Sequence, residues 1–248
     1  MGVARVVDFA VLDRVVAAAA RAAGGGVVIF DLDSTLLDNR PRQAQILREY
    51  GVRGKLEVLA QARAHHWTSW DIREAMRAVG CSDAQIAEHG EAAKTYWRET
   101  FFTSRYCAID DAIPGAAAYV ARLVGTGVRI AYCTGRHEEM RAGSLECFQR
   151  IGLPLPGDKV SLLMKPTLEQ GDDAWKAEAY ARLRGLGQVV AAFDNEPTHV
   201  NGYRAAFPDA ICVHLDTDHS GREVVLADGI VSVKRFAEDA RALPRAPR

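Results

Sequence analysis

Short, mainly apolar runs recur along the chain, and each is bounded by glycine or by polar residues. The run Val27–Phe30, between Gly26 and Asp31, contains no polar residue at all. Runs this short and this apolar indicate strands that are buried on both faces of a parallel sheet. The pattern predicts strands at Val27–Phe30, Val128–Cys133, Val160–Met164, Val189–Phe193 and Ala210–Leu215.

Segments with helical periodicity lie between these runs, at Ala116–Val124, Glu138–Ile151 and Ala174–Leu186. An alanine-rich amphipathic segment, Val3–Ala23, precedes the first run and is also expected to be a helix. Regular alternation of strands and helices is produced by right-handed crossover connections. The sequence therefore predicts an α/β fold with a doubly wound parallel sheet.

The stretch from Asn39 to Ala112 interrupts this alternation, because it contains no comparable apolar run. Its periodicity indicates helices, and glycines separate them. We predict an α/β core domain formed by residues 1–38 and 113–248, and a small helical domain formed by residues 39–112. The helices expected in the small domain are Gln43–Tyr50, Leu56–Ala64, Ser69–Val79 and Ala84–Phe102.

The helical domain is rich in aromatic residues, and we expect most of them to form its own core. One or two would be left to line a cleft. The residues considered for ligand selection are His65, His66, Trp67, Trp70 and Arg105.

Composition narrows the class of protein. Hydrophobic residues make up 48% and charged residues 25% of the chain, and the formal net charge is -1. These are values of a globular protein without a broad basic surface, so we expect neither membrane insertion nor binding to duplex nucleic acid. The five cysteines are scattered and form no Cys-x-x-Cys pair. We expect reduced thiols in a cytoplasmic protein of unknown oligomeric state.

Two carboxylates follow the first predicted strand. Asp31 and Asp33 leave the strand with i, i+2 spacing, so both side chains can address one spot. Two anions held together need a counter-charge, which a hard divalent cation supplies through oxygen ligands. Asp194 leaves a later strand directly and is a further candidate ligand, whereas Asn195 and Glu196 precede Pro197 and could cap a helix.

Thr134-Gly135-Arg136 follows the second major strand. A hydroxyl and a glycine before a helix N-terminus would hold a phosphate group, although an ordinary helix cap explains the same residues. Two lysines compete as the cation for an anionic substrate. Lys165 follows the strand Val160–Met164, and Lys176 lies near the start of the predicted helix Ala174–Leu186. A cation is disfavoured there unless an anionic site is nearby.

Together these motifs resemble the haloacid dehalogenase (HAD) superfamily, specifically its phosphatase branch. Val28–Leu36 matches the first family motif and Ala131–Arg136 the second. The third falls on Lys176, with Lys165 as the alternative, and the fourth on Asp194. The fourth motif departs from the family pattern, because the second acidic position could be Glu196 or be served by Asn195. The insertion resembles a helical cap placed after the first strand of a Rossmann-like HAD core.

The resemblance implies a Mg²⁺-dependent phosphatase acting on a small phosphorylated substrate. In that reading Asp31 is the nucleophile that forms an aspartyl-phosphate intermediate, and Asp33 is the general acid and base. Mg²⁺ would bind Asp31, the backbone carbonyl of Asp33, and Asp194. Thr134, Gly135 and Lys176, or Lys165 in its place, would hold the phosphoryl group. A phosphomutase or phosphotransferase of the same family, or a non-catalytic binding protein, are the alternatives.

Overall fold

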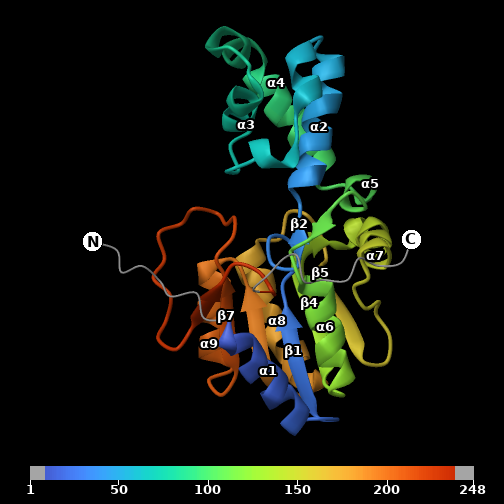
Figure 1. The fold of residues 1–248 in the computed structure, drawn as a ribbon, viewed down its shortest axis with the longest axis vertical. Coiled ribbons are helices and arrows are strands. Elements are labelled where there is room, and N and C mark those ends of the chain that lie inside the picture. Colours follow the sequence, from blue (N-terminus) through green and yellow to red (C-terminus); the bar gives the residue numbers. More distant parts are fainter. Residues whose placement is uncertain (1–8, 238–248) are drawn as a thin grey trace. The chain divides into compact units, whose positions relative to one another are not determined.

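The computed structural model describes residues 9–237, and the chain divides into two compact units (Figure 1). The α/β unit comprises Met1–Leu37, Ala112–Glu138 and Phe148–Arg248. The helical unit comprises Asp38–Asp111 and Glu139–Cys147. The sequence placed residues 139–147 in the core domain, whereas the structure groups them with the helices. The contacts responsible include the hydrogen bond, 2.7 Å long, from the Gly143 amide to Oγ of Ser104.

The α/β unit contains a six-stranded sheet in the order β5-β4-β1-β6-β7-β8, in which every neighbouring pair is parallel. This confirms the predicted doubly wound sheet. The strand order runs away from β1 in both directions, so the carboxyl end of β1 is the switch point where ligands of such sheets bind. The strands are β1 Gly26–Phe30, β4 Arg129–His137, β5 Val160–Lys165, β6 Gln188–Asp194, β7 Ile211–Leu215 and β8 Val231–Val233.

All five residues of β1 are buried, as expected of a central strand covered on both faces. One face packs on helices α8 and α9, whose Trp175 and Tyr203 share a core with Val27 and Ile29 of β1. On the other face, the ring of Phe30 contacts that of Tyr119 in α6. The helices of this unit and its boundary are α1 Ala10–Arg21, α6 Ala116–Gly125, α7 Arg141–Ile151, α8 Asp172–Leu186 and α9 Pro197–Ala206.

Two of the predicted helices, the one before β1 and the one after β4, are observed as α1 and α7. The helix predicted at Val3–Ala23 is α1, and residues 3–8 of that prediction lie outside the described part of the chain. The helix predicted from Glu138 is preceded by a 3-10 turn, Glu138–Met140, so that α7 begins at Arg141.

The helical unit has its own hydrophobic core, in which Leu47 of α2, Met76 of α3 and Ala93 of α4 are buried together with Trp67. Ser82 caps α4 in a capping box with Gln85. The predicted helix Leu56–Ala64 is wrong: two 3-10 turns, Glu57–Gln61 and Ala64–His66, occupy this stretch. The helices are α2 Arg40–Arg53, α3 Ile72–Val79, α4 Asp83–Phe101 and α5 Ser104–Cys107.

A buried ion pair links the ends of the helical unit's main segment. Nε of Arg42 lies 2.9 Å from Oδ1 of Asp110, and both side chains are fully buried. The guanidinium also lies over the ring of Phe101, 3.9 Å from its centroid. A two-stranded sheet of β2, Leu37–Asp38, and β3, Asp111–Ala112, forms where the chain passes between the two units.

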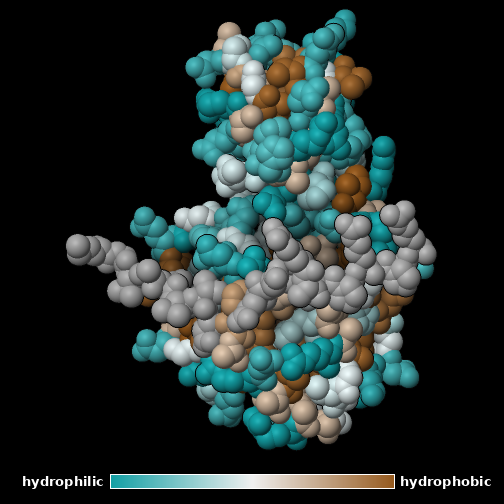
Figure 2. Space-filling view, viewed as in Figure 1, coloured by the Kyte–Doolittle hydropathy of each residue, from teal (hydrophilic) through white to brown (hydrophobic). Residues whose placement is uncertain are grey.

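Where Figure 2 shows described residues, hydrophobic residues lie in small groups among hydrophilic ones. All five cysteines are free and buried, in agreement with the expected reduced thiols. Within residues 9–237, no helix has the length and apolar character needed to span a membrane.

Candidate active site

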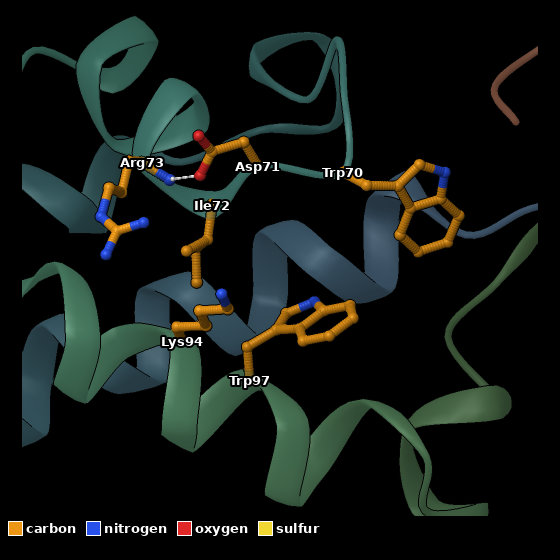
Figure 3. A pocket seen from close by; sticks show the side chains of 6 residues that line it. All are labelled: Trp70, Asp71, Ile72, Arg73, Lys94 and Trp97. Atoms are coloured by element: carbon orange, nitrogen blue, oxygen red, sulfur yellow. Dashed lines mark hydrogen bonds between the residues drawn. The ribbon is translucent and has the colours of Figure 1, made fainter. Parts of the chain in front are cut away.

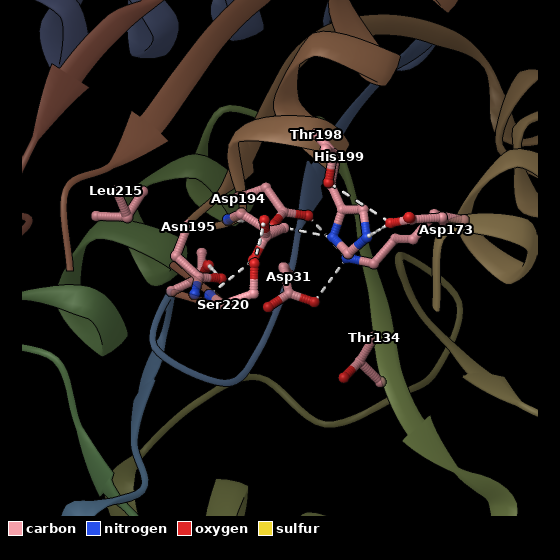
Figure 4. A network of polar contacts seen from close by, with 12 residues as sticks. Asp31, Thr134, Asp173, Asp194, Asn195, Thr198, His199, Leu215 and Ser220 are labelled. Atoms are coloured by element: carbon pink, nitrogen blue, oxygen red, sulfur yellow. Dashed lines mark hydrogen bonds and ion pairs between the residues drawn. The ribbon is translucent and has the colours of Figure 1, made fainter. Parts of the chain in front are cut away.

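Three of the predicted site residues lie at the carboxyl ends of adjacent strands. Asp31 directly follows β1, Asp194 ends β6 and Thr134 lies in β4 (Figure 4). β1 pairs with both neighbours, and the amide of Asp31 donates to the carbonyl of Phe193 over 2.9 Å. Parallel pairing therefore brings together residues that are far apart in the sequence.

Lys176 joins two of these strand ends from helix α8. Its Nζ atom donates to Oδ1 of Asp31 and to Oδ2 of Asp194, over 2.7 Å in each case. Burial alone lowers the pKa of this ammonium, but the charges of Asp194 and Asp31 outweigh burial and hold the pKa well above its usual value. Lys176 is therefore a buried, permanently charged group between two carboxylates.

The two carboxylates titrate differently. Burial raises the pKa of Asp31 to about 7, and the charge of Asp194 adds to this effect against the opposing charge of Lys176. Burial also acts to raise the pKa of Asp194, but Lys176 and His199 reverse the shift and hold it below its usual value. Asp194 is thus the stable anion of the pair, and Asp31 is the carboxylate that gains or loses a proton near neutrality.

Lys165 has a different partner. It ends β5, and its Nζ atom lies 2.7 Å from Oδ1 of Asp172 at the start of α8. The Asp172 carboxylate also explains why residue 135 is a glycine, because a Cβ atom there would lie 2.7 Å from Oδ2 of Asp172. Lys165, Asp172 and Gly135 therefore form one packed group, while Lys176 is the lysine that contacts the strand-end carboxylates.

Thr134 is not at a helix N-terminus, contrary to the prediction. β4 continues to His137, because it pairs with β5 beyond an irregularity, as Thr134↔Met164 and His137↔Lys165. Trp175, the neighbour of Lys176 in α8, donates its indole N–H to the Thr134 carbonyl over 2.8 Å. Helix α8 thus contacts Thr134 and both carboxylates through two consecutive residues.

Asp33 does not contact Lys176 within the described hydrogen bonds and ion pairs; it pairs with Arg136 instead. Nε and Nη2 of Arg136 donate to the two carboxylate oxygens of Asp33 over 2.8 and 2.7 Å. Sequence reasoning noted Arg136 as part of the second motif but gave it no role. Its position two residues after Thr134 is the sequence signal from which a role for Arg136 in the site could have been predicted.

Neither candidate for the second acidic position is free. Oδ1 of Asn195 accepts a hydrogen bond from the Thr35 hydroxyl over 3.2 Å. The Glu196 carboxylate accepts from both the amide and the hydroxyl of Ser220, over 3.0 and 2.9 Å. The first contact joins the residues after β6 to the turn after β1, and the contacts of Glu196 join them to the chain at Ser220 (Figure 4).

His199 lies beside Asp194 instead. Its Nδ1 atom is 3.5 Å from Oδ1 of Asp194, and its Nε2 atom is 2.8 Å from Oδ1 of Asp173 (Figure 4). Burial lowers the pKa of this imidazole, but the charge of Asp194 and the hydrogen bond to it act together in the opposite direction, and the net shift is upward. Asp173 in turn pairs with Arg222 over 2.7 Å. The sequence analysis predicted no role for His199.

The donor set fits a hard divalent cation. Asp31 and Asp194 converge on one ammonium, and their two negative charges exceed its single positive charge. The predicted third ligand is a backbone carbonyl, that of Asp33. Within residues 9–237, no three His, Cys, Asp or Glu side chains form a metal-binding group.

The helical unit contains a pocket of 330 Å³ between α3 and α4, lined by Trp70, Asp71, Ile72, Arg73, Lys94 and Trp97 (Figure 3). Two of its polar groups already have partners, because Asp71 caps α3 through the Arg73 amide and the Arg73 side chain pairs with Glu91. Of the residues considered for ligand selection, Trp70 lines this pocket. Trp67 belongs to the core, and His65, His66 and Arg105 do not line the pocket.

A doubly wound sheet with buried carboxylates and a lysine at its switch point defines the class of the protein as α/β, with a charged site where proteins of this class bind their ligands. Within that class, the chain is similar to a phosphoglycolate phosphatase of Mesorhizobium japonicum. The two are 23% identical over 215 residues, which cover 77% of this chain and 91% of the relative. The similarity to a phosphatase agrees with the resemblance to the phosphatase branch of the HAD superfamily that the sequence motifs predicted. No model of a known protein family matches the chain.

Two solved structures are also similar. Protein tyrosine kinase A of Mycobacterium tuberculosis is 21% identical, with a TM-score of 0.49, and the match covers 84% of this chain and 93% of that one. CbbY from Rhodobacter sphaeroides, solved in complex with phosphate, is 16% identical, with a TM-score of 0.47 and coverage of 86% and 95%.

Proposed function

We propose that the protein is a Mg²⁺-dependent phosphatase that hydrolyses a small phosphomonoester through an aspartyl-phosphate on Asp31. The observation that carries the proposal is the Lys176 ammonium between Asp31 and Asp194 at the switch point of the sheet. A buried cation beside a carboxylate nucleophile is the arrangement that attack on an anionic phosphoryl group requires. The similarity to a phosphoglycolate phosphatase makes 2-phosphoglycolate the first substrate to test.

Asp31 and Asp33 would carry out the two steps of the proposed reaction. In the first step a carboxylate oxygen of Asp31 forms a bond to phosphorus, the bond from phosphorus to the leaving oxygen breaks, and that oxygen takes a proton from Asp33. In the second step water forms the new bond to phosphorus and gives its proton to Asp33, and the bond from phosphorus to Asp31 breaks. Thr134 and Lys176 would bind the phosphoryl oxygens.

Asp31, Asp194 and the carbonyl of Asp33 would hold Mg²⁺. When bound, the ion would neutralise the repulsion between the phosphoryl oxygens and the nucleophile. The raised pKa of Asp31 supports this requirement, because a buried carboxylate beside another anion is stabilised in its charged form by added positive charge.

We further propose that residues 39–112, most of the helical unit, act as a cap domain that selects the substrate. The 330 Å³ pocket lined by Trp70 and Trp97 is the feature of this unit to vary when specificity is mapped. Replacing Trp70 by alanine and measuring kcat/KM over several phosphate esters tests this role, since a cap residue that selects would change the order of preference.

A panel of phosphate esters tests the proposed function. It should contain 2-phosphoglycolate, sugar phosphates, nucleoside monophosphates and 4-nitrophenyl phosphate, each with Mg²⁺ and with excess EDTA. We expect release of inorganic phosphate from at least one ester with Mg²⁺ and none with EDTA. Turnover that is unchanged by EDTA would contradict the metal requirement. Silence on every ester would contradict the phosphatase, and transfer of phosphate to an added sugar would indicate a phosphotransferase.

A further inference from the structure

The Asp33 carboxylate is held on both oxygens by one guanidinium. Nε of Arg136 donates to Oδ2 over 2.8 Å and Nη2 donates to Oδ1 over 2.7 Å. Two parallel hydrogen bonds between planar groups fix the plane of the carboxylate as well as its position. A single ammonium in the same place would fix neither the plane nor the position of the carboxylate as closely.

The two partners differ in exposure. The Arg136 side chain is 1% exposed, whereas the Asp33 side chain is 26% exposed. The guanidinium is thus almost inaccessible from solvent and grips the carboxylate from the protein side. The part of Asp33 that remains open is the part that can meet water or a leaving group.

The backbone conformation near Asp33 and near Arg136 indicates why the Asp33 side chain needs a partner that fixes it. Asp33 forms an isolated bridge with Leu37 just before a turn, and the first residue of that turn, Ser34, has a φ of 58°, in the left-handed region. Arg136, by contrast, lies within strand β4, and its amide donates to Oγ1 of Thr134 over 3.1 Å. A side chain from a strand of the main sheet therefore fixes a side chain from the connection that follows β1.

We propose that Arg136 is a positioning residue that holds the Asp33 carboxylate in the orientation from which it exchanges protons with the leaving group and with water. This inference rests on the proposed function. Displacement of a reacting group by about 1 Å costs about 100-fold in rate, so loss of the grip should act on kcat. Substrate binding, which is assigned to Thr134 and Lys176, should change little.

A double-mutant cycle on the full chain tests the inference, with 4-nitrophenyl phosphate and Mg²⁺ as the assay. Arg136→Met should lower kcat about 100-fold, with KM within a few-fold of the wild type. Arg136→Lys should recover little, because an ammonium cannot make the two parallel hydrogen bonds. In an Asp33→Ala background, Arg136→Met should cause no further loss, since no proton carrier is left to position.

Two controls separate positioning from folding. Asp33→Ala removes the carboxylate that a buried guanidinium contacts, so Asp33→Asn serves as a second background that keeps an acceptor. Arg122→Met removes an exposed pair with Asp13 and should leave kcat unchanged. Circular dichroism and urea unfolding would verify that each variant is folded.

The inference would be overturned if Arg136→Met lowered kcat in both the Asp33→Ala and the Asp33→Asn backgrounds by the same factor as in the wild type. Full recovery of kcat by Arg136→Lys would also overturn it. The outcome for the proposed function is separate. If the wild type is active and Asp31→Asn is inactive, the phosphatase stands whatever the cycle gives. If the wild type hydrolyses no phosphate ester, the phosphatase fails, and the positioning role fails with it.

Discussion

The Nζ atom of Lys176 lies 2.7 Å from Oδ1 of Asp31, although the two residues are 145 positions apart in the sequence. The sequence left Lys165 and Lys176 open as the phosphate-binding lysine, and this contact is the reason that we propose Lys176. We predict that Lys176→Met lowers kcat/KM about 100- to 1,000-fold, the usual cost of removing a group that stabilises developing charge. Lys165→Met is the matched control and should cost less than about 10-fold. Steady-state kinetics on one phosphate ester suffices, and a larger loss for Lys165→Met would assign the role to Lys165.

The raised pKa of Asp31 predicts a pH dependence of stability. Because its pKa in the folded protein is about 7, against an ordinary value of 3.8, the folded state binds more protons than the unfolded state between these values. Asp31 therefore favours folding at low pH, and this contribution is lost as the pH rises through about 7. Asp31→Asn cannot ionise, so it should be more stable than the wild type at pH 8, by about 1 kcal/mol or more.

Urea unfolding in EDTA at pH 5 and pH 8 measures this difference. The advantage of Asp31→Asn should be smaller at pH 5, where Asp31 of the wild type is protonated. An equal difference at both pH values would show that Asp31 does not titrate between them.

The hydrogen bond from Trp175 to the Thr134 carbonyl predicts a coupled loss of stability and activity. Trp175→Phe keeps an aromatic ring but leaves the buried carbonyl without its 2.8 Å donor. We expect unfolding to cost about 1–3 kcal/mol less, and KM to rise several-fold because Thr134 is less well placed. Trp67→Phe is the control, since the indole nitrogen of Trp67 is buried without a hydrogen-bond partner among the described residues. Equal destabilisation of both variants would argue against a role for this hydrogen bond.

The buried pair of Arg42 and Asp110 should stabilise the helical unit. Arg42→Met leaves the Asp110 carboxylate buried without its guanidinium, which typically costs about 3–5 kcal/mol. Arg122→Met, which removes a partner of the exposed Asp13, should cost less than about 1 kcal/mol. Urea unfolding monitored by circular dichroism compares the two. Similar small losses would mean that the buried pair adds little.

The apolar runs predicted the sheet well, because strands such as β1 are buried on both faces and are therefore continuous apolar runs in the sequence. β8 was missed, since its three residues, Val231–Val233, include a serine and are too short for a periodic signal. The end of β4 was also misplaced, because the extension of β4 past Thr134 depends on pairing with β5, which no local pattern encodes.

Local sequence patterns likewise predicted only part of the candidate site. Asp31, Thr134 and Asp194 could be found because each follows or lies within an apolar run. The choice between Lys165 and Lys176 could not, since it depends on which lysine α8 and β5 turn toward the carboxylates. The pairs of Arg136 with Asp33 and of His199 with Asp194 were likewise invisible, because each joins residues from separate elements.

The most direct test of the central claim is to look for phosphate bound covalently to Asp31. The wild type is mixed with Mg²⁺ and ³²P-labelled substrate, quenched in acid within one turnover, digested and mapped by mass spectrometry. We predict label on the peptide that contains Asp31, and neither label nor turnover in Asp31→Asn. Undiminished hydrolysis by Asp31→Asn, or label on a different residue, would contradict the assignment of Asp31 as the nucleophile.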